Sequence, residues 1–217
     1  MATMVSPSLL SADFLNLSKD VAMINNSDAD WLHLDIMDGM FVPNISFGFS
    51  VLEALPKELR KPMDVHYMTM HPEDYIDRTA KIGAMSMNVH VEACGERTRE
   101  ILERIHAAGM KAAVTISPDT PVKAVEPYLD VVEMVLVMGV HPGFGGQKFI
   151  PATVDRVREL KAMIKASGRD VLIEVDGGVD KTTAPILVEA GCDVLVSGSY
   201  IFKAENPYET IKQLRAL

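Results

Sequence analysis

The stretch that decides the fold is residues 171–197, which read VLIEVDGGVDKTTAPILVEAGCDVLVS. An apolar run of strand length, Val171–Val175, leads through a helical pattern to a second apolar run, Val194–Ser197. Gly191 follows the helical pattern, where the end of a helix favours a left-handed residue. Consecutive strands joined through a helix pair in parallel, so this stretch predicts a strand–helix–strand unit.

The same alternation runs through the whole chain. Helical patterns separate the apolar runs, for example Arg97–Ala108, Ala152–Ser167 and Pro207–Ala216. The strand candidates are Val5–Ser11, Trp31–Met37, Met63–Met68, Met85–Val91, Lys111–Ile116, Val131–Met138, Val171–Val175 and Val194–Ser197. Eight units in 217 residues predict an α/β fold, a single (β/α)8 TIM barrel domain over residues 1–217. An open doubly wound sheet is the alternative, but it usually has fewer strands and a glycine-rich loop after the first one.

Composition excludes several classes of partner. The net charge is −9, so the chain has no basic field for nucleic-acid phosphates. No apolar run approaches the ~20 residues that span a bilayer, and Met1–Ser6 lacks the pattern of a signal peptide. Cys94 and Cys192 lie in or beside apolar segments without Cys-x-x-Cys spacing, which predicts buried free thiols. We expect a cytoplasmic protein that binds a small molecule, not nucleic acid or a membrane.

Histidines and aspartates lie near the ends of three predicted strands, where a barrel builds its active site. Alternation places these side chains on shared faces: His33, Asp35 and Met37; Asp64, His66 and Met68; and, at the end of the seventh strand, Asp176. If these faces point inward, two histidines and two aspartates converge, and this donor set suits zinc or another first-row divalent ion. A lone polar residue on an apolar strand is more often a satisfied core residue. Four at matching heights are hard to place as neutral core, because each buried charge needs a partner.

Glycines follow the sixth, seventh and eighth strands. They lie in HPGFGGQ (141–147), in Gly177-Gly178, and in Gly198-Ser199 before a short helical segment from Tyr200. Glycine lets backbone N–H groups approach an anion, and a helix N-terminus adds a favourable dipole. Glycines also make ordinary tight turns, but three clusters at the usual phosphate site of a barrel favour a phosphorylated ligand.

Three methionines, Met37, Met68 and Met138, fall at strand ends. Core packing is the default interpretation in a chain with 14 methionines. Their shared height also allows a polarizable lid over the metal site. His90 and Glu92 share a face of the fourth strand, where hydrogen bonding within the barrel is favoured over contact with the ligand.

Five motifs make the chain resemble the ribulose-phosphate 3-epimerase family from Ser6 to Ala216. They are PSLLSADF (7–14), HLDIMDGMFVPN (33–44), DVHYM (64–68), PGFGGQKF (142–149) and EVDGG (174–178). The resemblance implies a metal-dependent isomerase of carbohydrate metabolism, in the pentose phosphate pathway. Its members interconvert D-ribulose 5-phosphate and D-xylulose 5-phosphate by two-base proton transfer at C3 through an enediolate. We expect one divalent ion (Zn, Fe, Mn or Co, with Zn favoured) and a homo-oligomer.

The resemblance also implies roles for individual residues. The implied metal ligands are His33, Asp35, His66 and Asp176, and the implied acid–base pair is Asp35 and Asp176. The implied substrate contacts are Ser8, His66, Gly143, Phe144, Gly145, Gly146, Asp176, Gly177, Gly178, Gly198 and Ser199. The family usually has Ser or Thr where Gly139 stands, and Asn, Asp or Glu where His141 stands.

Three alternatives stay open at this point. A C3 epimerase of another ketose phosphate, such as allulose 6-phosphate, shares the metal and both acids, so only substrate assays separate it. Decarboxylases and aldolase-type synthases of related barrels use an Asp-x-Lys-x-x-Asp array, whereas residues 35–38 read Asp-Ile-Met-Asp without a lysine. A non-catalytic barrel that binds sugar phosphate would be expected to lack one acid, and both are present.

Overall fold

Eight parallel strands form a closed barrel, as the sequence predicts. The computed structural model describes residues 3–217, and its strands pair in the order β1-β8-β7-β6-β5-β4-β3-β2. Their bounds are β1 Met4–Pro7, β2 Leu32–Met37, β3 Met63–Met68, β4 Ser86–His90, β5 Lys111–Ile116, β6 Met134–Met138, β7 Leu172–Asp176 and β8 Val194–Ser197. A parallel bridge between Ser8 and His33 joins the two edges of the sheet. Met1 and Ala2, which belong to the expected domain and to the segment searched for a signal peptide, lie outside the described range.

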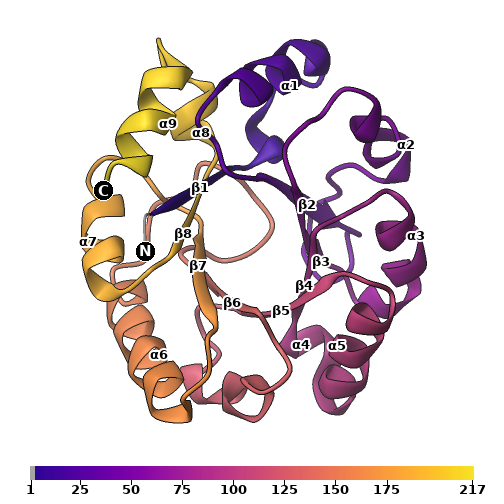
Figure 1. The fold of residues 1–217 in the computed structure, drawn as a ribbon, viewed down its shortest axis with the longest axis vertical. Helices are drawn as coiled ribbons and strands as arrows, with labels where there is room; N and C mark the ends of the chain where they lie inside the picture. The colour runs from indigo at the N-terminus through magenta and orange to yellow at the C-terminus, as the bar shows by residue number, and fades with distance from the viewer. Residues whose placement is uncertain (1–2) are drawn as a thin grey trace.

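Helices surround the strands (Figure 1). They are α1 Leu17–Asn26, α2 Phe49–Leu52, α3 Ile76–Lys81, α4 Val91–Cys94, α5 Thr98–Ala107, α6 Thr153–Ser167, α7 Ala184–Ala190, α8 Ser199–Phe202 and α9 Pro207–Arg215. Short 3-10 helices cover Leu9–Ser11, Leu55–Lys57, Pro72–Tyr75, Gly95–Arg97 and Val122–Tyr128. Gly191 ends α7 in a left-handed conformation, with φ of 108°. Among residues 3–217, no helix combines the length and apolarity needed to cross a bilayer.

The strands separate apolar from polar side chains by alternation. On β2, Leu32, Leu34 and Ile36 join the main hydrophobic core, while the intervening His33 and Asp35 lie on the opposite face. Both faces are buried, because the helices cover the outside of the barrel and the inward side chains fill its interior. The period of two therefore aims the polar residues of β2 into the barrel. Cys94 and Cys192 are buried free thiols, as expected.

Two predicted strands are too long. The first ends at Pro7, because hydrogen bonds from Ser11 to Ser8 and from Ala12 to Leu9 turn the next residues into a 3-10 helix. The sixth begins at Met134 instead of Val131, because the Val131 N–H closes a turn onto Tyr128. The other six predicted strands agree with the structure to within one residue at each end.

Candidate active site

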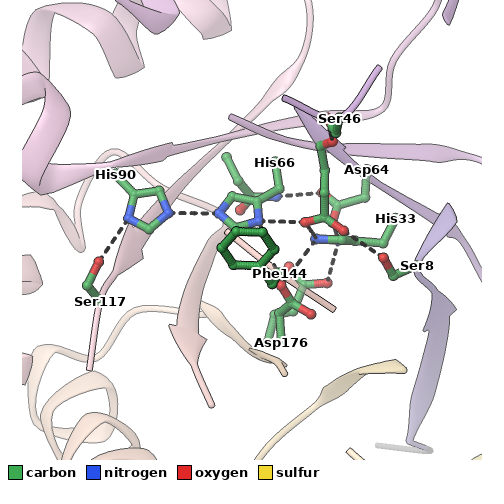
Figure 2. Close-up of polar contacts among 12 residues, drawn as sticks. Ser8, His33, Ser46, Asp64, His66, His90, Ser117, Phe144 and Asp176 are labelled. Carbon is green, nitrogen blue, oxygen red and sulfur yellow. Dashed lines mark hydrogen bonds and ion pairs between the residues drawn. The ribbon is translucent and has the colours of Figure 1, made fainter. Parts of the chain in front are cut away.

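Four side chains from β2, β3 and β7 meet inside the barrel. Nε2 of His33 lies 3.3 Å from Oδ1 of Asp35 and 4.0 Å from Oδ2 of Asp176. Nδ1 of His66 lies 3.1 Å and 3.8 Å from the same two oxygens. One donor atom from each of the four residues lies within 4.8 Å of every other. Figure 2 shows His33, His66 and Asp176 of this group. The fold thus brings together the four residues that alternation places at the strand ends.

The donor set fits a divalent cation. Both histidine side chains are fully buried, and Nε2 of His33 has no hydrogen-bond partner among the described residues. A buried polar nitrogen without a partner carries a desolvation cost, which a ligand to that nitrogen would remove. Two imidazole nitrogens and two carboxylate oxygens are a combination that first-row divalent ions accept.

Asp64 fixes the ring of His33. Nδ1 of His33 donates to Oδ2 of Asp64 at 2.7 Å, and Oδ1 of Asp64 accepts from Ser86 Oγ at 2.5 Å and Asn88 Nδ2 at 2.7 Å. A carboxylate on the outer nitrogen of a metal-binding histidine sets its tautomer and orientation. Glu174 is fully buried beside this pair, and burial together with the charge of Asp64 raises the pKa of Glu174 well above its ordinary value.

The two aspartates have opposite electrostatic environments. Burial disfavours charge on Asp35, but the neighbouring His33 and His66 outweigh it and lower the pKa of Asp35. Burial and the negative charge of Asp35 raise the pKa of Asp176 to about 7. The hydroxyl of Ser8 donates to Oδ2 of Asp35 at 2.6 Å and holds that carboxylate in place. Paired carboxylates whose pKa values are pushed apart can divide the roles of base and acid.

A cavity of about 700 Å³ opens over Asp35 and Asp176. Nearly all the expected contacts line it: Ser8, Gly143, Phe144, Gly145, Gly146, Gly177, Gly178, Gly198 and Ser199, together with Met37, Met68 and Met138. His66 is the exception among the expected substrate contacts, because its side chain is fully buried and does not reach the cavity wall. The contact of His66 with the substrate therefore stays a prediction, and its place in the group of four donor residues makes it a candidate ligand to a cation.

Close packing requires glycine at three positions near the site. Gly178 has a φ of 68°, and a Cβ added there would lie 2.7 Å from Cα of Phe149. A Cβ added at Gly198 would lie 2.5 Å from Oγ of Ser11. At the junction of β6 and β7, the N–H of Gly139 donates to the carbonyl oxygen of Asp176 at 2.6 Å. A Cβ at Gly139 would collide with the carbonyl oxygen of Gly177.

Lys203 and Asn44 are functional candidates of the cavity region that no sequence pattern singled out. Lys203 lines the cavity together with Gly198 and Ser199. The sequence pattern that could have identified it is its position four residues after Ser199, which is one helical turn away. Asn44 donates from Nδ2 to the carbonyl oxygen of Gly143 at 2.7 Å and steadies the glycine-rich loop. That contact joins positions 99 residues apart, so no local pattern could reveal it.

Comparison with known proteins decides the family. Residues 4–202 match the model of the Ribulose-phosphate 3 epimerase family. The chain belongs to the ribulose-phosphate 3-epimerase family. The ribulose-phosphate 3-epimerase of Bacillus subtilis (strain 168) is 44% identical over 212 residues, which cover 97% of each chain. That of Rhodobacter capsulatus is 48% identical over 199 residues, covering 92% of this chain and 86% of the relative.

Family membership makes the protein an isomerase, and the resemblance found in the motifs is confirmed. Solved structures show the barrel independently. A 3-hexulose-6-phosphate synthase superposes with a TM-score of 0.71 at 21% identity, covering 100% of this chain and 99% of the other. KGPDC from Streptococcus mutans superposes with a TM-score of 0.72 at 14% identity, and the match covers 99% of this chain and 96% of the other. At such low sequence identity, these two structures support the fold and nothing about function.

Proposed function

We propose that this epimerase interconverts D-ribulose 5-phosphate and D-xylulose 5-phosphate by moving the proton at C3. The observation that carries the proposal is the pair of carboxylates, Asp35 on β2 and Asp176 on β7, on the wall of one cavity beside two buried histidines. The relatives named ribulose-phosphate 3-epimerase, which match nearly the whole chain, support the choice of substrate.

Two proton routes are the chemical requirement. Inverting C3 means removing a proton from one face of the substrate and returning one to the other, and the C2 ketone acidifies that proton. Asp35 acts on one face and Asp176 on the other, and the two exchange roles when the reaction reverses. The hydroxyl of Ser8 keeps the Asp35 carboxylate aimed at the cavity. A positioned general base or acid contributes about 10²–10⁴ in rate.

The metal ligands in this proposal are His33, Asp35, His66 and Asp176, and Zn²⁺ is favoured over Fe²⁺, Mn²⁺ and Co²⁺ for this mixed donor set. When bound, the ion supplies positive charge that stabilises the enediolate form of the substrate. The three methionines of the cavity wall, Met37, Met68 and Met138, form the lid of the site. Their side chains cover the reacting carbons without offering a competing proton donor.

The phosphate is held at the ends of β7 and β8. Backbone N–H groups of Gly177, Gly178, Gly198 and Ser199 surround that part of the cavity, and the ammonium group of Lys203 adds a positive charge. Phe144 and its neighbouring glycines, Gly143, Gly145 and Gly146, line the same cavity. The sugar then lies between the phosphate site and the two carboxylates.

Assays of C3 epimerisation with several ketose phosphates, with and without a chelator, test the proposal. We expect the highest kcat/KM for D-ribulose 5-phosphate, with activity lost on chelation and restored by added metal. A higher kcat/KM for D-allulose 6-phosphate would reassign the substrate, and binding without turnover would indicate a non-catalytic barrel. Elemental analysis of His66→Ala tests the metal site separately, since metal content equal to wild type would exclude it.

A further inference from the structure

A buried chain of hydrogen bonds leads from His66 toward the surface. Nε2 of His66, the ring nitrogen that faces away from the two catalytic carboxylates, lies 2.9 Å from Nε2 of His90. Nδ1 of His90 lies 3.1 Å from Oε2 of Glu92. Both histidine side chains are fully buried, whereas that of Glu92 is 25% exposed. Figure 2 shows the ring of His90 beside His66, with Ser117 on its far side.

Two ring nitrogens at this separation share a single proton. His66 directs Nδ1 at the proposed metal, and a nitrogen that binds a metal carries no proton, so the proton of neutral His66 lies on Nε2. Nε2 of His90 must then accept, which places the proton of neutral His90 on Nδ1. That proton is donated to Glu92, whose carboxylate only accepts when ionised.

Glu92 is held in one orientation by the loop after β5. Its Oε1 accepts from the backbone N–H of Ser117 at 2.7 Å and from the hydroxyl of Thr120. Its Oε2 is left for His90. Oε1 of Glu92 therefore accepts from two donors of the loop, and Oε2 accepts from the imidazole of His90.

We propose that His90 and Glu92 are positioning residues that set the tautomer of His66, so that Nδ1 of His66 presents a lone pair to the metal site. The inference rests on the proposed metal function. Asp64 does the same for His33 directly. For His66 the controlling carboxylate lies one imidazole further away and reaches solvent. Loss of such an outer partner typically weakens metal binding by about 10–100-fold.

Glu92→Gln should reverse the donor and acceptor roles along the hydrogen bonds from residue 92 through His90 to His66. The backbone N–H of Ser117 cannot turn away, so the amide oxygen takes the position of Oε1 and the amide NH2 faces His90. Nδ1 of His90 then accepts from that amide, and from the more distant hydroxyl of Ser117 at 3.4 Å, and its proton moves to Nε2. Nε2 of His66 becomes the acceptor, which leaves the His66 proton on Nδ1, where the metal would bind.

The experiment combines two measurements on the full chain. The affinity for Co²⁺ is measured by competition with a chromophoric chelator, and the tautomers are read by proton–nitrogen correlation NMR of isotope-labelled histidines in metal-free protein. We expect Glu92→Gln to bind Co²⁺ about 10–100-fold more weakly and to move the His90 proton from Nδ1 to Nε2.

Glu133→Gln is a matched control. Its carboxylate also bridges an imidazole and a backbone N–H, accepting from His106 at 2.8 Å and from Ala112 at 2.9 Å. This pair joins α5 to the start of β6 and takes no part in the site. We expect unchanged Co²⁺ affinity in this variant, with the unfolding midpoint measured for all three proteins.

Four results would overturn the positioning role. They are unchanged Co²⁺ affinity in Glu92→Gln, weaker binding without a change of the His90 tautomer, an equal loss of affinity in the control, or a wild-type spectrum with the His90 proton on Nε2. For the last of these the spectrum is recorded on Zn²⁺-loaded wild type, because without metal Nδ1 of His66 also faces the carboxylate of Asp35 at 3.1 Å. That result counts even if Glu92→Gln does not fold. Wild-type protein that binds no Co²⁺ would overturn the metal site itself, and the inference with it.

Discussion

Replacing Asp176 with asparagine should remove a pH-dependent loss of stability from chelator-treated protein. Burial and the charge of Asp35 raise the pKa of Asp176 to about 7, whereas an aspartate in an unfolded chain titrates near ~3.9. Between these values the folded protein holds a proton that the unfolded chain has released. The stabilisation is complete below the unfolded pKa and is lost as the pH rises through the folded one, by about 1.4 kcal/mol per pH unit.

The size of the effect follows from this window. From pH 5 to pH 8 the wild-type free energy of unfolding should fall by about 2.5 kcal/mol through this carboxyl alone, which for a chain of this length is roughly 5–10 °C in Tm. Asp176→Asn keeps the shape of the side chain but binds no proton, so its curve should lack that fall. The charge of Asp176 also raises the pKa of Glu174. Removing that charge lowers the pKa of Glu174 and so further reduces the fall in stability with rising pH.

Urea unfolding followed by circular dichroism, at four pH values between 5 and 8 in the presence of a chelator, measures both proteins. Groups elsewhere titrate equally in both, so the difference between the two pH dependences isolates the site. Parallel curves for wild type and variant would refute the reasoning. Added Zn²⁺ should restore the wild-type stability at pH 8, because a cation among the carboxylates compensates their charge.

Three further changes test separate parts of the site. Asp64→Asn should weaken Zn²⁺ binding by about 10–100-fold in a competition assay, because the ring of His33 loses its charged acceptor; unchanged affinity would count against that role. Gly198→Val should raise KM about tenfold with metal content retained, since the new side chain would press on Ser11 beside the phosphate site; an unaltered KM would place the phosphate elsewhere. Metal-loaded Asp176→Asn should still exchange the C3 proton of one epimer with deuterated water while net epimerisation collapses, and epimerisation near the wild-type rate would exclude this residue as an essential base.

Much of the site could be predicted because alternation is a local property. His33 and Asp35 lie two residues apart on one strand, so they share a face whatever the rest of the fold does. The contact between His66 and His90 depends instead on how β3 and β4 pair. Their register places His66 opposite Asn88, and His90 follows two residues later on the same face. That register is a tertiary property, which explains why the sequence favoured hydrogen bonding of His90 within the barrel without naming its partner.

Other features lay beyond any strand pattern. Ser8 reaches Asp35 because the chain turns into a 3-10 helix directly after β1, a turn that the apolar run Val5–Ser11 concealed. Asn44 arrives from a segment distant in the sequence from the glycine-rich loop that it contacts. In each case the missing information was the path of a loop, which hydrophobic periodicity does not encode.

The tight junction at Gly139 limits how this enzyme can exchange residues with its relatives. Consensus design replaces a residue by the one most frequent among relatives, as a stabilising change. Here a side chain would displace the carbonyl of Gly177 and, with it, the backbone that faces the phosphate. Position 139 is therefore one that library design should hold as glycine, because the carbonyl oxygen of Gly177 fills the space that a side chain there would need.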